Sequence, residues 1–108
     1  DWCGKLRSSE VSKMTRPEAT IENRFVKYAK EQGCLAIKLR IDGRNGWPDR
    51  TVITPAGRTM FVEFKTATGR LSAAQREWIV ELQSMGYDVT VATSFKQAKD
   101  ALDLFLTE

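Results

Sequence analysis

Residues 50–65 constrain the fold most strongly, because their pattern is that of two strands joined by a tight turn. Both ends of the segment are rich in β-branched and aromatic side chains, and Pro55-Ala56-Gly57 stands between them. A three-residue loop of this kind suits a hairpin, since proline fixes the first turn residue and glycine takes the left-handed position. The register set by that loop predicts that Asp49 lies directly opposite Glu63.

Two carboxylates in such a pair need a partner of opposite charge. Side chains directly opposite each other in an antiparallel pair have Cβ atoms roughly 5 Å apart, and like charges at that distance are destabilising. A hard divalent cation would neutralise Asp49 and Glu63 together. Strand alternation also places Lys65 on the same face as Glu63. Two carboxylates and an ammonium around a cation are typical of a metal-dependent phosphodiesterase site.

The composition limits the chemistry that the chain can perform. The 108 residues suit one globular domain, and no apolar run reaches transmembrane length. The net charge of +3 is compatible with a polyanionic partner without requiring one. Cys3 and Cys34 lack zinc spacing and follow no secretory signal, which favours a reducing, cytoplasmic setting. The absence of histidine excludes histidine triads and histidine-ligated zinc hydrolases.

Hydrophobic periodicity and capping signals predict an α/β domain. Thr15 with Glu18 and Ser72 with Gln75 have capping-box spacing, and Ser94 suits the cap of a last helix. We expect residues 1–14 to be an N-terminal tail and residues 15–108 to be a single domain. The predicted elements, in the order α-β-β-β-α-β-α, are a helix at about 15–33, strands at 34–41, 50–54 and 59–65, a helix at 72–85, a strand at 88–93 and a helix after 94.

Three apolar faces are expected to bury against one another. In strand 34–41 the alternation predicts one buried face, and each of the two later helices carries a stripe at helical spacing. The members of these faces are Leu35, Ile37, Leu39 and Ile41 in the strand, Trp78, Ile79, Leu82 and Met85 in the second helix, and Phe95, Ala98, Leu102, Phe105 and Leu106 in the last helix.

Each candidate site residue also has an ordinary structural interpretation. Asp49 follows proline and could be a turn residue, and Lys65 could be a surface lysine at a strand end. Glu63 lies among apolar neighbours, where a carboxylate is costly without a reason. Glu22 could be a solvated glutamate at the edge of the first helix. Gln75 could serve only the capping box, although a side chain there could also reach a phosphate or a water bound to the metal.

Five basic residues around the predicted site could contact a phosphate backbone, with dispersed surface charge as the equally open alternative. They are Lys38, Arg40, Arg44, Arg50 and Arg70. Trp47 is expected to anchor its loop by packing, with base stacking as the other interpretation.

Four motifs occur together in a characteristic order: Ile21-Glu22-Asn23, Gly46-Trp47-Pro48-Asp49-Arg50, Phe61-Val62-Glu63-Phe64-Lys65, and Gly69-Arg70-Leu71-Ser72-Ala73-Ala74-Gln75. Through them the chain resembles the VRR-NUC family of the PD-(D/E)xK nuclease superfamily over about residues 15–94. The chain lacks the Val-Arg-Arg signature of the family name, and Trp47 replaces the usual small or aliphatic residue before Pro-Asp.

The resemblance implies a restriction-endonuclease-like fold with a four-stranded mixed sheet flanked by helices. It implies a catalytic core of Asp49, Glu63 and Lys65, with Glu22 and Gln75 as additional active-site residues. It also implies an endodeoxyribonuclease that acts on branched DNA such as four-way junctions. Stand-alone members of the family look like homodimers, and this chain resembles that type.

The expected cofactor is Mg²⁺ or Mn²⁺, held by Asp49, Glu63 and the backbone carbonyl of Phe64, with Glu22 as a further candidate ligand. We expect no small-molecule cofactor and no membrane partner. The expected setting is the cytoplasm of a bacterium or a phage-infected cell, in DNA recombination or repair. The rival hypotheses are a non-catalytic module that binds branched DNA and keeps a vestigial site, and a structural subunit that only dimerises.

Overall fold

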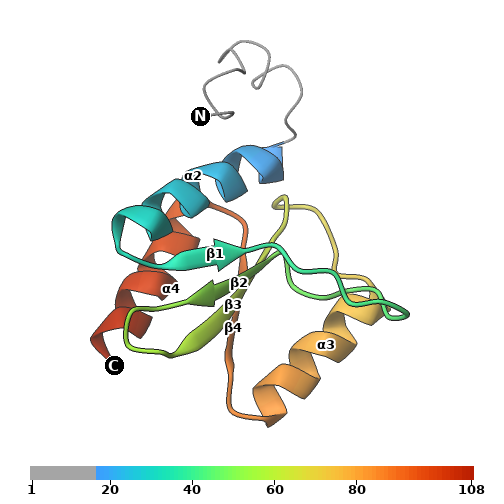
Figure 1. The fold of residues 1–108 in the computed structure, drawn as a ribbon. Coiled ribbons are helices and arrows are strands. Elements are labelled where there is room, and N and C mark those ends of the chain that lie inside the picture. Colours follow the sequence, from blue (N-terminus) through green and yellow to red (C-terminus); the bar gives the residue numbers. More distant parts are fainter. Residues whose placement is uncertain (1–16) are drawn as a thin grey trace.

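The computed structural model describes residues 17–108, which form three helices around one sheet (Figure 1). The predicted tail 1–14 and the Thr15 cap lie outside the described residues. The element order is the predicted one. The elements are α2 (Pro17–Glu31), β1 (Leu35–Ile37), β2 (Arg50–Ile53), β3 (Thr59–Phe64), α3 (Ala73–Ser84), β4 (Asp88–Ala92) and α4 (Phe95–Thr107).

The sheet is mixed and has the order β1-β2-β3-β4. The first two pairings are antiparallel, and β4 runs parallel to β3. In the β2–β3 hairpin Arg50 pairs with Val62, so the predicted register is confirmed. The turn has the predicted form as well, because Thr54 and Arg58 close it by a backbone bond of 2.9 Å and Gly57 has a φ of 78°. This register brings the residues before β2 alongside the end of β3.

Helices cover the two faces of the sheet unequally. Helices α2 and α4 pack together on one face, while α3 stands on the opposite side (Figure 1). The buried core lies between the sheet and the α2/α4 pair, where Phe25, Val62 and Leu102 are almost completely buried. The capping box of Ser72 with Gln75 is present at the start of α3, and Ser94 caps α4. None of the described helices is long and apolar enough to cross a membrane.

The predicted buried face of strand 34–41 is wrong. The strand covers only Leu35–Ile37, and Leu35 is 62% exposed, whereas Ala36 on the opposite face packs against the core. The ladder between β1 and β2 ends at the pair of Ile37 with Thr51. Leu39 and Ile41 therefore lie beyond the strand and are exposed.

The stripe predicted for the second helix is shorter than expected. Leu82 is buried and Trp78 and Ile79 are half-buried, but Met85 is 75% exposed. Met85 is the C-cap of α3, and Gly86 follows with a φ of 91°. The helix has ended at this point and the chain turns toward β4, so helical periodicity no longer places the side chain. The face predicted for the last helix is confirmed, since its five members are buried or packed against the core.

Candidate active site

Asp49 is joined to the end of β3 by two hydrogen bonds that involve the backbone, one to Glu63 and one from Phe64. The Asp49 N–H donates to Glu63 Oε1 over 3.1 Å, and the Phe64 N–H donates to Asp49 Oδ2 over 2.8 Å. Glu63 is 3% exposed, and Asp49 is half-buried after the buried Pro48. The sheet register thus fixes two carboxylates beside each other in surroundings with little water.

Gln75 connects this pair to the start of α3. Its Nε2 donates to Glu63 Oε2 over 2.8 Å, while its Oε1 accepts the Ser72 N–H over 2.7 Å. The Ser72 hydroxyl in turn accepts the Gln75 N–H over 3.1 Å. The capping and active-site interpretations of Gln75 are therefore compatible, because the two ends of one amide serve the two contacts.

The environment favours the protonated form of both carboxyls. Burial, together with the negative charge of Asp49, raises the pKa of Glu63 to about 8. Burial also raises the pKa of Asp49, against the Phe64 N–H that lowers it, and the charge of Glu22 raises it further. At neutral pH two full charges are costly here unless a proton or a cation lies between them.

Lys65 follows β3 and lies near the carboxylates. Its backbone N–H donates to the Ala92 carbonyl over 2.9 Å, which continues the β3–β4 ladder by one residue. The positive charge of Lys65 lowers the pKa of Glu63. A Cβ added at Gly69 would lie 3.4 Å from Lys65 Nζ, so the loop before α3 passes close to the ammonium group. The ammonium is therefore confined between this loop and the acidic pair.

Glu22 on α2 reaches the same region from the other side of the sheet. It is buried, and its Oε2 lies 2.7 Å from Arg50 Nε and 3.7 Å from Lys38 Nζ. Arg50 also donates to the Ala36 carbonyl over 3.2 Å. The negative charge of Glu22 contributes to the raised pKa of Asp49.

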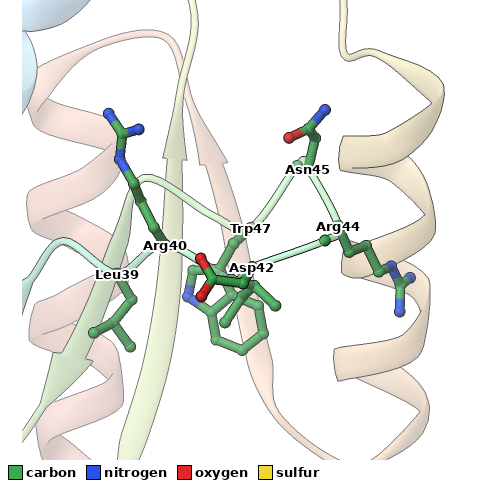
Figure 2. Close-up of a pocket in the computed structure, with 9 residues that line it drawn as sticks. Leu39, Arg40, Asp42, Arg44, Asn45 and Trp47 are labelled. Carbon is green, nitrogen blue, oxygen red and sulfur yellow. The ribbon is translucent and has the colours of Figure 1, made fainter.

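The loop 39–47 lines a pocket of about 420 Å³ beside these residues (Figure 2). Trp47 anchors it, with its ring centroid 5.3 Å from that of Phe61 and 4.8 Å from that of Trp78, and with its Nε1 donating to the Thr51 hydroxyl over 3.0 Å. The packing interpretation of Trp47 is therefore confirmed. Gly46 adopts a φ of 98° and presses against the Ala74 backbone at the start of α3.

The five basic candidates occupy different environments. Arg44 extends toward α3, lies 3.6 Å from the Trp78 ring centroid and pairs with Glu81 over 2.8 Å, whereas Arg40 extends away from that helix (Figure 2). Arg50 is committed to Glu22 and the Ala36 carbonyl. Lys38, Arg40 and Arg70 are exposed. Contact with DNA stays a prediction for all five residues.

The donor set fits a cation of the Mg²⁺ type. Among residues 17–108 no group of three or more histidine, cysteine or acidic side chains could enclose a metal ion. Mg²⁺ does not need such a cage, because it keeps several waters and is commonly held by one or two carboxylates together with substrate phosphates. Asp49 and Glu63 offer such a pair, and a cation would offset the repulsion that raises the pKa of Glu63.

Two contacts of this region were not predicted. The sequence interpretation of Arg50 is a residue that contacts phosphate or a dispersed surface charge, but strand alternation places it on the opposite face from Asp49, which is the face that α2 covers. That alternation, read together with Glu22 on the first helix, was a signal for the ion pair. The close approach of Gly46 to α3 has no comparable signal, since a glycine in a loop does not indicate which element it meets.

Comparisons with known proteins agree with this geometry. The model of the VRR-NUC domain family matches residues 7–96. A protein named "Putative nuclease p44", from Acyrthosiphon pisum secondary endosymbiont phage 1, is 34% identical over 77 residues, which are 71% of this chain and 83% of that protein.

Two solved structures of VRR-NUC domains share the fold. One has a TM-score of 0.76 and 29% identity, covering 82% of this chain and 97% of the other. The second has a TM-score of 0.68 and 18% identity, covering 83% and 88%, and bears on the fold alone. The family match spans most of the chain, and the sheet order and helix arrangement are those of an α/β nuclease fold. The chain therefore belongs to the VRR-NUC family and is a nuclease domain.

Proposed function

We propose that the protein is an endodeoxyribonuclease that requires Mg²⁺ or Mn²⁺ and selects branched DNA. The observation that carries the proposal is the pair of the buried Glu63 and the half-buried Asp49, which hydrogen bonds from the Asp49 and Phe64 N–H groups hold in place and which Lys65 accompanies. Buried carboxylates with a raised pKa at the end of two strands serve no evident packing purpose, and perturbed acids of this kind mark functional sites.

Asp49 and Glu63 would hold the cation, with the Phe64 carbonyl and Glu22 as further candidate ligands. When bound, the cation supplies charge neutralisation at the phosphate and a more acidic water. The Phe64 N–H already holds the Asp49 side chain, and Gln75 holds that of Glu63. Both side chains therefore need little reorganisation to bind the cation.

Lys65 would orient the attacking water and assist its deprotonation. The ammonium lies where it lowers the pKa of Glu63, and so it also favours negative charge that develops beside the acidic pair. Attack of the water oxygen on phosphorus forms one P–O bond and breaks the P–O3′ bond, leaving a 5′-phosphate and a 3′-hydroxyl after proton transfer to the leaving oxygen.

The selection of branched DNA rests on the likeness to stand-alone members of the family. A two-fold dimer would present two active sites to two strands of a junction. Exposed Arg40 and Arg70, together with Lys38, provide positive charge around the acidic pair, as binding to a phosphate backbone requires. We propose cytoplasmic DNA recombination or repair as the setting.

The test is a cleavage assay on four substrates of matched length: a four-way junction, a flap, linear duplex and single-stranded DNA. Each is incubated with Mg²⁺, Mn²⁺ or EDTA. We expect paired nicks near the junction centre that need the divalent cation, and little cleavage of the linear duplex. Glu63→Ala should be inactive, and Glu31→Gln, a change at an exposed carboxylate at the end of α2, should retain full activity.

The same assay distinguishes the alternatives. Junction binding without cleavage in any metal would overturn the proposal and favour a non-catalytic binding module. Cleavage that persists in Glu63→Ala would place the active site elsewhere. Equal cleavage of the junction and the linear duplex would retain the nuclease and remove the branched-DNA preference. Sedimentation of the free protein tests the dimer separately.

A further inference from the structure

Arg50 is held more tightly than the other basic residues of the site. Its guanidinium Nε donates to Glu22 Oε2 over 2.7 Å, and its NH1 donates to the Ala36 carbonyl over 3.2 Å. The side chains of Arg50 and Glu22 are only 17% and 11% exposed. One planar group thus joins β2 to α2 and to β1, in a geometry that the fork of an arginine provides and a point charge does not.

The ion pair uses only one oxygen of Glu22. Arg50 Nε and Lys38 Nζ both approach Oε2, at 2.7 Å and 3.7 Å, so neither of these cations is bonded through Oε1. The Arg50 contact ties Oε2 to β2 and leaves Oε1 to other partners. Arg50 follows Asp49 directly in the chain, so the Glu22 carboxylate that it holds lies near the acidic pair.

We infer that Arg50 is a positioning residue that fixes the Glu22 carboxylate beside Asp49, so that Glu22 can take part in holding the divalent cation or its waters. The inference rests on the proposed function. It gives Arg50 a role besides the predicted contact with DNA, because two of its N–H donors are used by Glu22 and the Ala36 carbonyl.

The inference predicts an effect opposite to that of simple charge repulsion. A positive charge near a cation site weakens cation binding, so removal of Arg50 would strengthen it if charge were the only factor. A positioning role predicts weaker binding instead, since partners that orient the groups around a metal typically contribute 10-fold to 100-fold to affinity or activity. The direction of the change therefore separates the two roles.

The experiment is a double-mutant cycle on Arg50 and Glu22. Mn²⁺ binding to the DNA-free protein is measured by calorimetry, and the Mn²⁺ dependence of junction cleavage is measured in parallel. Arg50→Gln is expected to weaken Mn²⁺ binding by 10-fold or more and to raise the half-saturating Mn²⁺ concentration of cleavage by a similar factor. At saturating Mn²⁺ most of the rate should return. In the Glu22→Gln background, Arg50→Gln should add less than two-fold.

Two further variants keep the result interpretable. Arg50→Lys keeps the charge but cannot make both contacts, so we expect it to lose less Mn²⁺ affinity than Arg50→Gln does. It also allows the test to proceed if Arg50→Gln fails to fold. Arg58→Gln is the matched control. Arg58 also bridges a carbonyl and a carboxylate, those of Phe105 and Glu108, but it lies at the turn of the hairpin. Its loss should leave the Mn²⁺ dependence unchanged.

The outcomes that overturn the inference differ from those that overturn the proposed function. Unchanged or tighter Mn²⁺ binding in Arg50→Gln and Arg50→Lys, or equal effects of Arg50→Gln with and without Glu22, would refute the positioning role while the nuclease stands. A wild-type protein that neither binds Mn²⁺ nor cleaves any substrate would refute the proposed function and this inference with it.

Discussion

Gln75 and Glu63 are joined by a 2.8 Å hydrogen bond that links helix capping to the candidate active site. The amide nitrogen of Gln75 holds Glu63 Oε2, and the amide oxygen closes the capping box with Ser72. Since the cap fixes where α3 begins, it also fixes the donor that orients Glu63. The stability of the helix start and the geometry of the acidic pair therefore depend on one side chain.

Gln75→Ala should reduce both stability and cleavage. Ser72 still caps the helix through the backbone N–H of residue 75, so the loss of the Ser72 N–H bond to the amide oxygen is expected to lower the free energy of unfolding by about 1 kcal/mol. The loss of the Glu63 partner should slow cleavage about 10-fold to 100-fold. Urea unfolding and junction cleavage at saturating Mg²⁺ measure the two effects.

Gln97→Ala is the control for that change. Gln97 lies in the first turn of α4, and its Oε1 accepts the Thr93 N–H over 2.7 Å, away from the acidic pair. It should lose comparable stability and no cleavage activity. Equal cleavage by Gln75→Ala and Gln97→Ala would show that the contact with Glu63 has no catalytic consequence.

The pKa of Glu63 predicts how stability depends on pH in the absence of divalent cations. Burial and the charge of Asp49 raise this pKa from its ordinary value of 4.5 to about 8, so between these values the folded state binds more protons than the unfolded state. Stability should therefore fall as pH rises from about 4.5 to about 8, with a slope approaching 1.4 kcal/mol per pH unit. The raised pKa of Asp49 acts in the same direction.

Urea unfolding in EDTA across this pH range measures the slope, and Glu63→Gln should flatten it. The lowered pKa of Asp103 does not interfere, because the stability that it contributes is lost only at more acidic pH, as the carboxylate becomes protonated. Bound Mg²⁺ would compete with the proton, so its affinity should rise with pH up to about 8. A stability that rises with pH between 5 and 8 would contradict the assignment.

The sequence was most informative where a local rule determines the geometry. The Pro55-Ala56-Gly57 turn determines the hairpin register, and that register alone places Asp49 beside Glu63. Capping signals located the starts of α3 and α4, because a cap depends on residues within one turn of each other.

The failures have a common physical cause. Alternation shows that a strand has two faces but not which face the tertiary structure covers, and so Leu35 was assigned to the wrong side. Likewise, the sequence does not predict the ion pairs of Arg50 and Arg44, because their partners, Glu22 and Glu81, lie 28 and 37 positions away in the chain. Long-range ion pairs follow from packing, which periodicity within one element does not describe.

Gly46→Ala should destabilise the loop more than Gly43→Ala does. Both glycines have a positive φ, at 98° and 80°, which costs a residue with a Cβ roughly 1 kcal/mol. A Cβ at Gly46 would also lie 2.6 Å from the Ala74 carbonyl carbon, whereas a Cβ at Gly43 would meet nothing within 4 Å.

We therefore expect a loss of about 2–4 kcal/mol for Gly46→Ala and about 1 kcal/mol for Gly43→Ala, measured by urea unfolding. Because Gly46 contacts the backbone beside Gln75, its variant should also cleave more slowly than Gly43→Ala. Similar losses of stability in the two variants would mean that the loop shifts away from α3 without penalty.

Lys65→Met should separate catalysis from folding. Methionine keeps the apolar part of the side chain and removes the ammonium, so the fold is expected to persist while junction cleavage falls by about 10²-fold to 10⁴-fold. Loss of the ammonium also removes the positive charge that lowers the pKa of Glu63, so that pKa should rise further. The stability-versus-pH curve of the variant in EDTA should accordingly keep falling to a higher pH than that of the wild type.

Lys30→Met, at an exposed position on α2, is the matched control and should change neither the cleavage rate nor the stability-versus-pH curve. Cleavage by Lys65→Met at the wild-type rate, or an unchanged stability-versus-pH curve, would place the ammonium outside the site.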